Sequence, residues 1–216
     1  MSEHASGAPR VSDDLRRILA AADGQAMQVS EILRHSDGRG LQTIAIILCL
    51  PFLSPVAIPG LSVPFGAAIA ICGLRIAFRH QPWLPGALMR RSIPFPVLDK
   101  MLRFGIAAYS RLEKSLRARW LVFTGSHTSQ MAAGLSISLA AVLMSLPIPP
   151  PFPLTNTLPA LAIILISLGM LERDGVVIFC GYLLTAISTV YVALIAALGG
   201  AGVAKIWSLL GSWVPQ

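Results

Sequence analysis

The stretch PIPPPFPLTNTLPALAIILISLGMLERDG, residues 147–175, decides how this chain can fold. Its first part, residues 147–153, holds five prolines within an apolar region, and the polar residues 155–157 then precede a second apolar run. A proline inside a helix removes a backbone hydrogen bond and clashes with the preceding turn. The chain therefore cannot continue here as one straight helix, and the stretch predicts a hairpin of two helical arms.

The first half of the chain carries a similar order of breaks and apolar runs. Two proline-containing breaks, LPFLSP at 50–55 and PGLSVP at 59–64, precede an apolar run at 65–76. Three pairs of residues have nearly the same spacing: Pro51 and Pro147 are 96 residues apart, Pro64 and Pro159 are 95 apart, and Gly73 and Gly169 are 96 apart. The spacing predicts an internal duplication, with chance agreement among many prolines as the alternative.

Composition is typical of an integral membrane protein. Apolar residues make up 55% of the chain, the mean hydropathy is +0.71, and only 12% of residues are charged, where a soluble domain has about 25%. Cys49, Cys72 and Cys180 each stand alone in apolar sequence, without CxxC or histidine spacing. We therefore expect no metal, no other cofactor and no disulfide.

These features predict an all-α integral membrane protein with two repeated, broken-helix hairpins of re-entrant type. The predicted parts are a cytoplasmic amphipathic helical segment (1–39), a first hairpin (40–79), a basic cytoplasmic loop with an interfacial helix (80–125), a second hairpin (126–175), and a transmembrane helix with its tail (176–216). The arm at 41–50 would extend about 15 Å, half of a hydrocarbon core of roughly 30 Å. Two complete crossings joined by a tight turn are the alternative to a re-entrant hairpin.

Local signals predict the ends of the helices. Ser12 is the expected cap of a first short helix, and a second is expected from Ser30. The hairpin arms are predicted over 61–78, 130–146 and 157–171, with Ser126 or His127 as the cap of the middle one. The run at 176–198 has 23 residues without a charge and is the clearest transmembrane span. The glycine-rich sequence at 199–202 is predicted to end it, and a separate interfacial helix is expected over 205–213.

A basic segment separates the two hairpins. Residues 79–119 contain nine lysines or arginines and two acidic residues, a net charge of +7 that equals the charge of the whole chain. The positive-inside rule places this segment in the cytoplasm. Apolar residues at helical spacing over 97–120 predict an interfacial helix, whose basic residues would meet anionic lipid head groups. Membrane lipids are the expected partner of this charge, and nucleic acid is not.

The two breaks provide the first candidate binding residues. Ser62 and Asn156 are the predicted N-caps of the second arms, and Thr155 and Thr157 flank the second of them. Irregular backbone at membrane depth persists only within protein or beside a wet cavity, and many transporters bind substrate at the ends of such broken helices. The N-termini would favour a small or anionic solute. In the alternative interpretation, these side chains only satisfy nearby backbone groups.

Charged residues at the other ends of the second arms provide further candidates. Arg75 is the only charge in its predicted arm, and Glu172 or Asp174 is its expected partner. An ionisable residue in a membrane segment is a functional hypothesis by default, although Arg75 could instead extend to the interface. The sequence has no Ser-His-Asp pattern, metal-ligand spacing or glycine-rich phosphate loop, so we do not expect an enzyme.

Several motifs together resemble one known family. They are LPFLSPVAIPGLSVP (50–64), RHQPWLP (79–85), RRSIP (90–94), NTLPALAI (156–163) and GMLERDG (169–175). This order resembles the ExoD family of bacterial exopolysaccharide-synthesis proteins, over roughly residues 15–198. The resemblance implies an inner-membrane protein associated with exopolysaccharide production, without an established reaction, and it adds Arg173 to the candidate residues. Members of the family often carry a neutral polar residue near Arg75, which weakens a mechanism centred on that charge.

Three functions follow from these observations. The first is a small transporter or channel-like protein, the second a non-catalytic assembly or interaction protein of the polysaccharide machinery, and the third a lipid scramblase-like protein. The charge distribution favours parallel hairpins that both open to the cytoplasm, whereas the analogy with transporters favours inverted ones. A chain of this size has few helices with which to enclose a cavity, so we expect a homodimer.

Overall fold

The computed structural model describes residues 11–34, 40–53, 62–78, 86, 90, 92–112, 120, 126–146 and 154–211. The elements in these ranges are α1 (Val11–Ala22), β1 (Met27–Gln28), α2 (Val29–Arg34), α3 (Gly40–Cys49), the 3-10 helix η1 (Leu50–Leu53), α4 (Ser62–Ala77), β2 (Ser92–Ile93), α6 (Phe95–Leu112), α8 (His127–Ser145), α9 (Thr157–Glu172) and α10 (Gly175–Gly211). The predicted helical class is confirmed, apart from a short antiparallel pairing of β1 with β2. Each strand has only two residues, too few to leave a periodic signal in the sequence.

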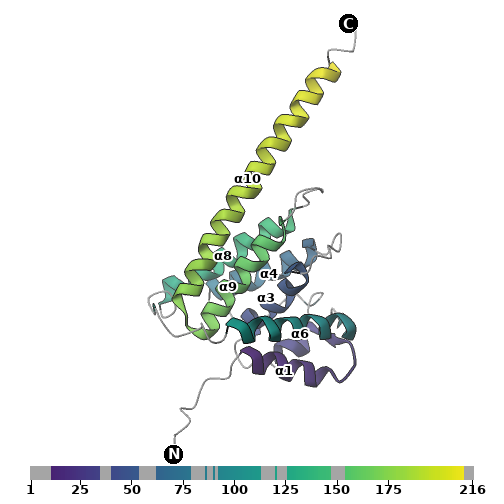
Figure 1. Cartoon of the computed structure of the whole chain (residues 1–216), viewed down its shortest axis with the longest axis vertical. Helices are drawn as coiled ribbons and strands as arrows, with labels where there is room; N and C mark the ends of the chain where they lie inside the picture. The colour runs from purple at the N-terminus through teal and green to yellow at the C-terminus, as the bar shows by residue number, and fades with distance from the viewer. Residues whose placement is uncertain are drawn as a thin grey trace, which may run out of the picture.

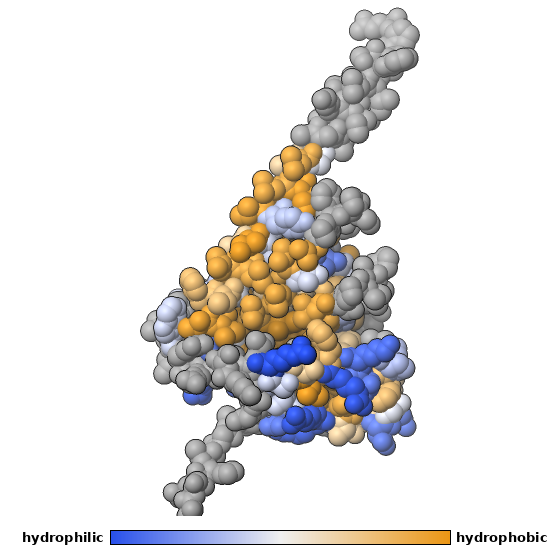
Figure 2. All heavy atoms as spheres, viewed as in Figure 1, coloured by the Kyte–Doolittle hydropathy of each residue, from blue (hydrophilic) through white to orange (hydrophobic). Residues whose placement is uncertain are grey.

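The helices form two parts with different surfaces. In Figure 1, α8 and α9 lie along the first half of α10, and α4 packs against α8. α1 and α6 lie side by side across one end of this bundle. Figure 2 shows an apolar surface over the bundle and a hydrophilic surface over the α1 and α6 end. The chain therefore separates its apolar and its polar surface along the direction of α10.

The helix predicted to lie at the membrane interface, α6, packs against α1. This helix spans Phe95–Leu112 rather than 97–120, and its residues Leu98 and Leu102 are fully buried. α1 packs against α6 and contributes the buried residues Leu15 and Ile18 to the same core. Both helices are amphipathic, and each covers the apolar face of the other. Much of the apolar face of α6 is thus buried inside the protein, and a position of this helix at the membrane interface stays a prediction.

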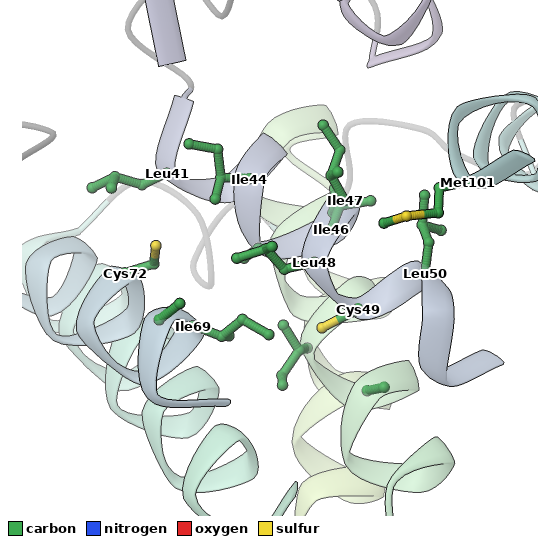
Figure 3. Close-up of a cluster of buried hydrophobic side chains, with 14 of the residues drawn as sticks. Leu41, Ile44, Ile46, Ile47, Leu48, Cys49, Leu50, Ile69, Cys72 and Met101 are labelled. Carbon is green, nitrogen blue, oxygen red and sulfur yellow. The ribbon is translucent and has the colours of Figure 1, made fainter. Parts of the chain in front are cut away.

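The first arm of the first hairpin is short and deeply buried. α3 ends at Cys49, and η1 follows where Pro51 interrupts the helix. Figure 3 shows α3 side chains together with Ile69 and Cys72 of α4 and Met101 of α6. The predicted arms over 61–78, 130–146 and 157–171 correspond to α4, α8 and α9. Residues 54–61 and 147–153 lie outside the described ranges. The re-entrant form and the duplication therefore stay predictions, as do the five predicted parts.

α4 and α8 approach each other closely at small residues. A methyl group added to Gly134 of α8 would lie 2.7 Å from Ala77 Cα of α4, and one added to Gly73 would lie 2.7 Å from the carbonyl oxygen of Gly134. Ser138 Oγ also donates a 3.0 Å hydrogen bond to the Ala70 carbonyl. Such close contact is a common way to join helices that have no hydrophobic driving force between them in a lipid environment.

Of the predicted helix ends, the N-cap of α8 is confirmed, whereas the N-cap of α1 and the end of α10 are wrong. Ser126 caps α8, its Oγ accepting a 3.0 Å hydrogen bond from the Ser129 amide, whereas Ser12 lies inside α1 and is buried. α10 runs unbroken over Gly175–Gly211, 37 residues, so the predicted end at 199–202 and the separate helix over 205–213 are wrong. A glycine costs about 1 kcal/mol relative to alanine in a helix and, unlike proline, keeps its amide donor.

Candidate functional site

The first break and the start of α9 meet through one hydrogen bond. Thr157 Oγ1 donates to the carbonyl oxygen of Phe52 in η1 over 2.9 Å, across 105 residues of sequence. The Phe52 ring also packs edge-to-face on Phe65, in the first turns of α4, with ring centroids 6.1 Å apart. The interpretation of Thr157 as a purely local hydrogen-bond partner is therefore wrong. Phe52 thus contacts the first turns of both α4 and α9, which are the second arms of the two hairpins. The apolar sequence around Phe52, next to Pro51, did not indicate this role.

Asn156 occupies the N-cap position of α9 but does not cap it with its side chain. Its backbone is helical, with φ −97° and ψ −31°, and its side chain makes no capping hydrogen bond. The turn before α9 supplies carbonyls instead: Leu158 N–H donates to Leu154 O at 3.0 Å, and Ala160 N–H donates to Asn156 O at 3.1 Å. The predicted side-chain cap is wrong because backbone groups already satisfy these amides.

Ser62 and Thr155 lie near the same region. Ser62 is the first residue of α4, one turn before Phe65, and residue 61 lies outside the described residues, so its role as a cap stays a prediction. Thr155 is half-buried in the turn that precedes α9. Ser62 and Thr157 thus lie at the starts of two helices that both contact η1. α4 makes this contact through Phe65, and α9 makes it through Thr157. We call Ser62, Phe52, Asn156 and Thr157 the break cluster.

The acidic candidates lie at the opposite end of α9. Glu172 Oε1 accepts a 3.0 Å hydrogen bond from Tyr109 Oη of α6. Asp174 is fully buried, and its Oδ1 accepts a 3.0 Å hydrogen bond from the Val176 amide in the first turn of α10. Both proposed partners of Arg75 therefore have other bonds, and the Arg75 pair stays a prediction. About 22 Å of helix separates Thr157 from Glu172, so the candidates form two groups instead of one site.

The turn between α9 and α10 has an unusual backbone. Arg173 is left-handed, with φ 54°, and its N–H donates to Gly169 O. The Asp174 N–H donates to the same carbonyl at 2.9 Å, which is a typical helix ending except that glycine usually holds the left-handed position. At Gly175, an added methyl group would lie 2.8 Å from Trp120 Cβ. Only glycine permits this approach. The position of Trp120 on this turn and its left-handed φ were not predicted from the sequence.

Two helices of the described chain are long and apolar enough to cross a membrane. They are His127–Ser145, which is α8, and Gly175–Gly199, the first part of α10. Within the described ranges, no three histidine, cysteine, aspartate or glutamate residues are grouped so that they could hold a metal ion. The described part of the chain is thus almost entirely α-helical, and the length and composition of these two helices suit a membrane.

Comparison with known proteins assigns the family. The chain belongs to the ExoD family: a family model described as "Exopolysaccharide synthesis, ExoD" matches residues 11–194. Protein ExoD of Rhizobium meliloti (strain 1021) is 37% identical over 185 residues, covering 86% of this chain and 77% of that protein. The resemblance of the motifs to this family is thereby confirmed, and it links the chain to exopolysaccharide synthesis.

A second relative covers nearly the whole chain. The protein slr1875 of Synechocystis sp., whose name describes it as uncharacterized, is 26% identical over 208 residues, or 95% of this chain and 96% of that one. No solved structure matches this chain.

Proposed function

We propose that this protein is a multi-pass protein of the bacterial inner membrane that acts in exopolysaccharide synthesis as a small, non-catalytic transporter or channel-like protein. Its solute would be small or anionic, and it would bind at the break cluster. The family assignment supports the link to exopolysaccharide, and the two apolar helices support the membrane location.

The observation that carries this proposal is the hydrogen bond from Thr157 to Phe52. It holds the start of α9 against the break of the first hairpin, and the contact of Phe65 with Phe52 holds the start of α4 there as well. A helix N-terminus carries partial positive charge and favours an anion. The Asn156 side chain, half-buried and not used as a cap, is available to donate to such a solute.

The proposed orientation places the α1 and α6 end in the cytoplasm. This end carries the hydrophilic surface in Figure 2, and it includes part of the basic segment at 79–119, whose net charge is +7. The bundle would then lie in the bilayer. Because the bundle has few helices, we propose a homodimer, as expected from the size of the chain.

A second candidate is a non-catalytic assembly or interaction protein of the polysaccharide machinery. The observation that favours it is the filling of the bundle by apolar side chains from α3, where Ile44 and Ile47 are 1% exposed (Figure 3). In this interpretation, the hydrogen bond between Thr157 and Phe52 serves only to pack the two hairpins together.

A thermal-shift screen of the detergent-purified full chain distinguishes these two functions. The probes are chloride, phosphate, sulfate, sugar phosphates and lipid-linked sugars. A ligand at 100 times its dissociation constant stabilises the folded state by about 2.7 kcal/mol. We expect stabilisation by at least one anion, and we expect Asn156→Ala to remove it.

The same variant connects binding to function in cells. Asn156→Ala should insert into the membrane normally and should fail to restore exopolysaccharide in a strain lacking the gene. Full restoration by Asn156→Ala, or no stabilisation by any probe, would favour the assembly protein. Thr128→Ala is the matched control, because Thr128 is an exposed polar residue in the first turn of α8.

A further inference from the structure

An exposed cation and an exposed tryptophan lie at the turn where α10 begins. Trp120 packs over Gly175, the first residue of α10, and its ring is 6.3 Å from that of Phe179, edge-to-face. Trp120 is nevertheless 57% exposed. Arg173 lies two residues before Gly175 and is exposed. Neither residue belongs to the break cluster, which lies at the other end of α9.

Both residues have a left-handed backbone conformation that residues other than glycine seldom adopt. Trp120 has φ 52° and Arg173 has φ 54°. Left-handed backbone is disfavoured for residues with a Cβ, and such conformations cluster at binding sites where the surrounding structure maintains them. At Arg173 a glycine would complete the helix ending without strain. The backbone of this turn therefore does not require an arginine, and the exposed guanidinium is open to a ligand.

The acidic residues beside Arg173 already have hydrogen-bond donors. Glu172 accepts from Tyr109, and Asp174 accepts from the first amides of α10. None of the described residues forms an ion pair with the Arg173 guanidinium. The turn therefore presents a positive charge on its outer surface, while the N-terminus of α10 is already occupied by a carboxylate.

An apolar stripe leads away from this charge along α10. Its members are large apolar residues between 47% and 71% exposed, at the three- and four-residue spacing of one helix face: Phe179, Leu183, Ile187, Val190, Leu194 and Leu198. The stripe begins at the Trp120 ring and extends for about 28 Å at 1.5 Å per residue, nearly the full thickness of a hydrocarbon core of roughly 30 Å. A cation, an indole and an apolar stripe thus follow one another along the surface.

We propose that this surface is a binding site for one anionic phospholipid. The Arg173 guanidinium binds the phosphate, since arginine forms paired, charge-assisted hydrogen bonds with phosphate oxygens. Trp120 lies at the level of the head group, where tryptophan is enriched in membrane proteins, and an acyl chain lies along the stripe from Phe179 to Ile187. This inference rests on the membrane location proposed above and is independent of the solute site.

Native mass spectrometry of the detergent-purified full chain tests the site. The protein is titrated with phosphatidylglycerol, with phosphatidylcholine of the same acyl chains, and with glycerol phosphate, which has the phosphate but no acyl chain. We expect one phosphatidylglycerol to be retained, with about tenfold weaker retention in Arg173→Gly because the charge-assisted pair is lost. Glycine suits the left-handed position, so this variant separates binding from folding.

Three further variants complete the test. Arg173→Lys should keep most of the retention, and Trp120→Ala should weaken it. Arg16→Gln is the control, because Arg16 is equally charged and its side chain is 62% exposed on α1, and it should change nothing.

Two results would overturn the site. Equal retention of both phospholipids, unchanged in Arg173→Gly, would mean that lipid only surrounds the helix. Glycerol phosphate that binds as tightly as phosphatidylglycerol would mean a site for soluble phosphate. Fractionation of cell membranes tests the membrane location separately, since a chain found only in the soluble fraction would contradict that location whatever the lipid titration shows.

Discussion

The hydroxyl of Tyr109 on α6 donates a hydrogen bond of 3.0 Å to Glu172 at the end of α9, and the two residues are 63 positions apart. Tyr109 is 5% exposed, so this bond is shielded from water. This hydrogen bond joins α6, in the hydrophilic layer formed by α1 and α6, to α9 in the apolar bundle. Glu172 is the residue directly before Arg173, in the turn between α9 and α10. The position of this layer therefore depends on a hydrogen bond to a carboxylate as well as on apolar packing.

Tyr109→Phe is expected to lower the free energy of unfolding by about 1–2 kcal/mol, because a partly buried carboxylate loses its donor. The measurement is denaturant unfolding of the detergent-solubilised protein, followed by circular dichroism. Tyr182→Phe is the matched control, since the Tyr182 hydroxyl is buried and has no hydrogen-bond partner among the described residues. It should be neutral or stabilising. An equal loss for the two variants would show that the bond to Glu172 contributes nothing.

Gly134→Ala is expected to destabilise the bundle by about 1–3 kcal/mol, because the added methyl group forces apart two packed helices. Its nearest neighbours are backbone atoms of Gly73 and Ala77, which cannot move aside as a flexible side chain can. Gly199→Ala serves as the comparison, since nothing lies within 4 Å of a methyl group there. That change should stabilise α10 by up to about 1 kcal/mol through helix propensity. Thermal unfolding of both variants measures the difference.

Asp174→Ala is expected to cost about 1–2 kcal/mol, because α10 loses the carboxylate that caps its first amides. Asn156→Ala should cost only about a few tenths of a kcal/mol, since its side chain makes no capping bond. Both residues precede a helix, so the pair compares a bonded with an unbonded cap position. Chemical unfolding of the two variants in the same detergent provides the comparison. A larger loss at Asn156 than at Asp174 would contradict the structure.

Thr157→Val is expected to lower the free energy of unfolding by about 1 kcal/mol, because the Phe52 carbonyl loses its donor while the side-chain shape is kept. Thr157→Ser retains the hydroxyl and should retain most of the stability. If the break cluster is a binding site, Thr157→Val should also reduce the restoration of exopolysaccharide in cells. Equal stability of the valine and serine variants would exclude a contribution from this bond.

The boundaries of the arms were predictable because their causes are local. Proline at residue 51 and within 147–153 ends a helix wherever it stands, and apolar runs of limited length supply α4, α8 and α9 between these ends. The prediction of a helix end failed where the local sequence signal was weak. The glycines at 199–202 lower helix propensity without preventing a helix, and α10 continues through them.

For the candidate residues, the sequence identified positions but not the distant groups that they bond. Thr157 and Glu172 were identified from their positions, but their partners were not, because Phe52 and Tyr109 lie 105 and 63 residues away from the groups they bond. Asn156 was placed correctly at the start of α9, yet its capping role depended on a backbone angle that a preceding turn decides. Trp120 was not identified as a candidate, because its neighbours Gly175 and Phe179 lie far away in the sequence.

The sequence by itself determined the apolar character of the chain, its proline-broken arms and its family, because composition, proline chemistry and motif order need no three-dimensional context. The tertiary structure alone decided which surfaces remain exposed. α1 covers apolar residues of α6, whereas Arg173 and the stripe on α10 stay exposed. Each amphipathic helix could have buried its face in lipid or in protein, and only the packing of distant segments selects between these two outcomes.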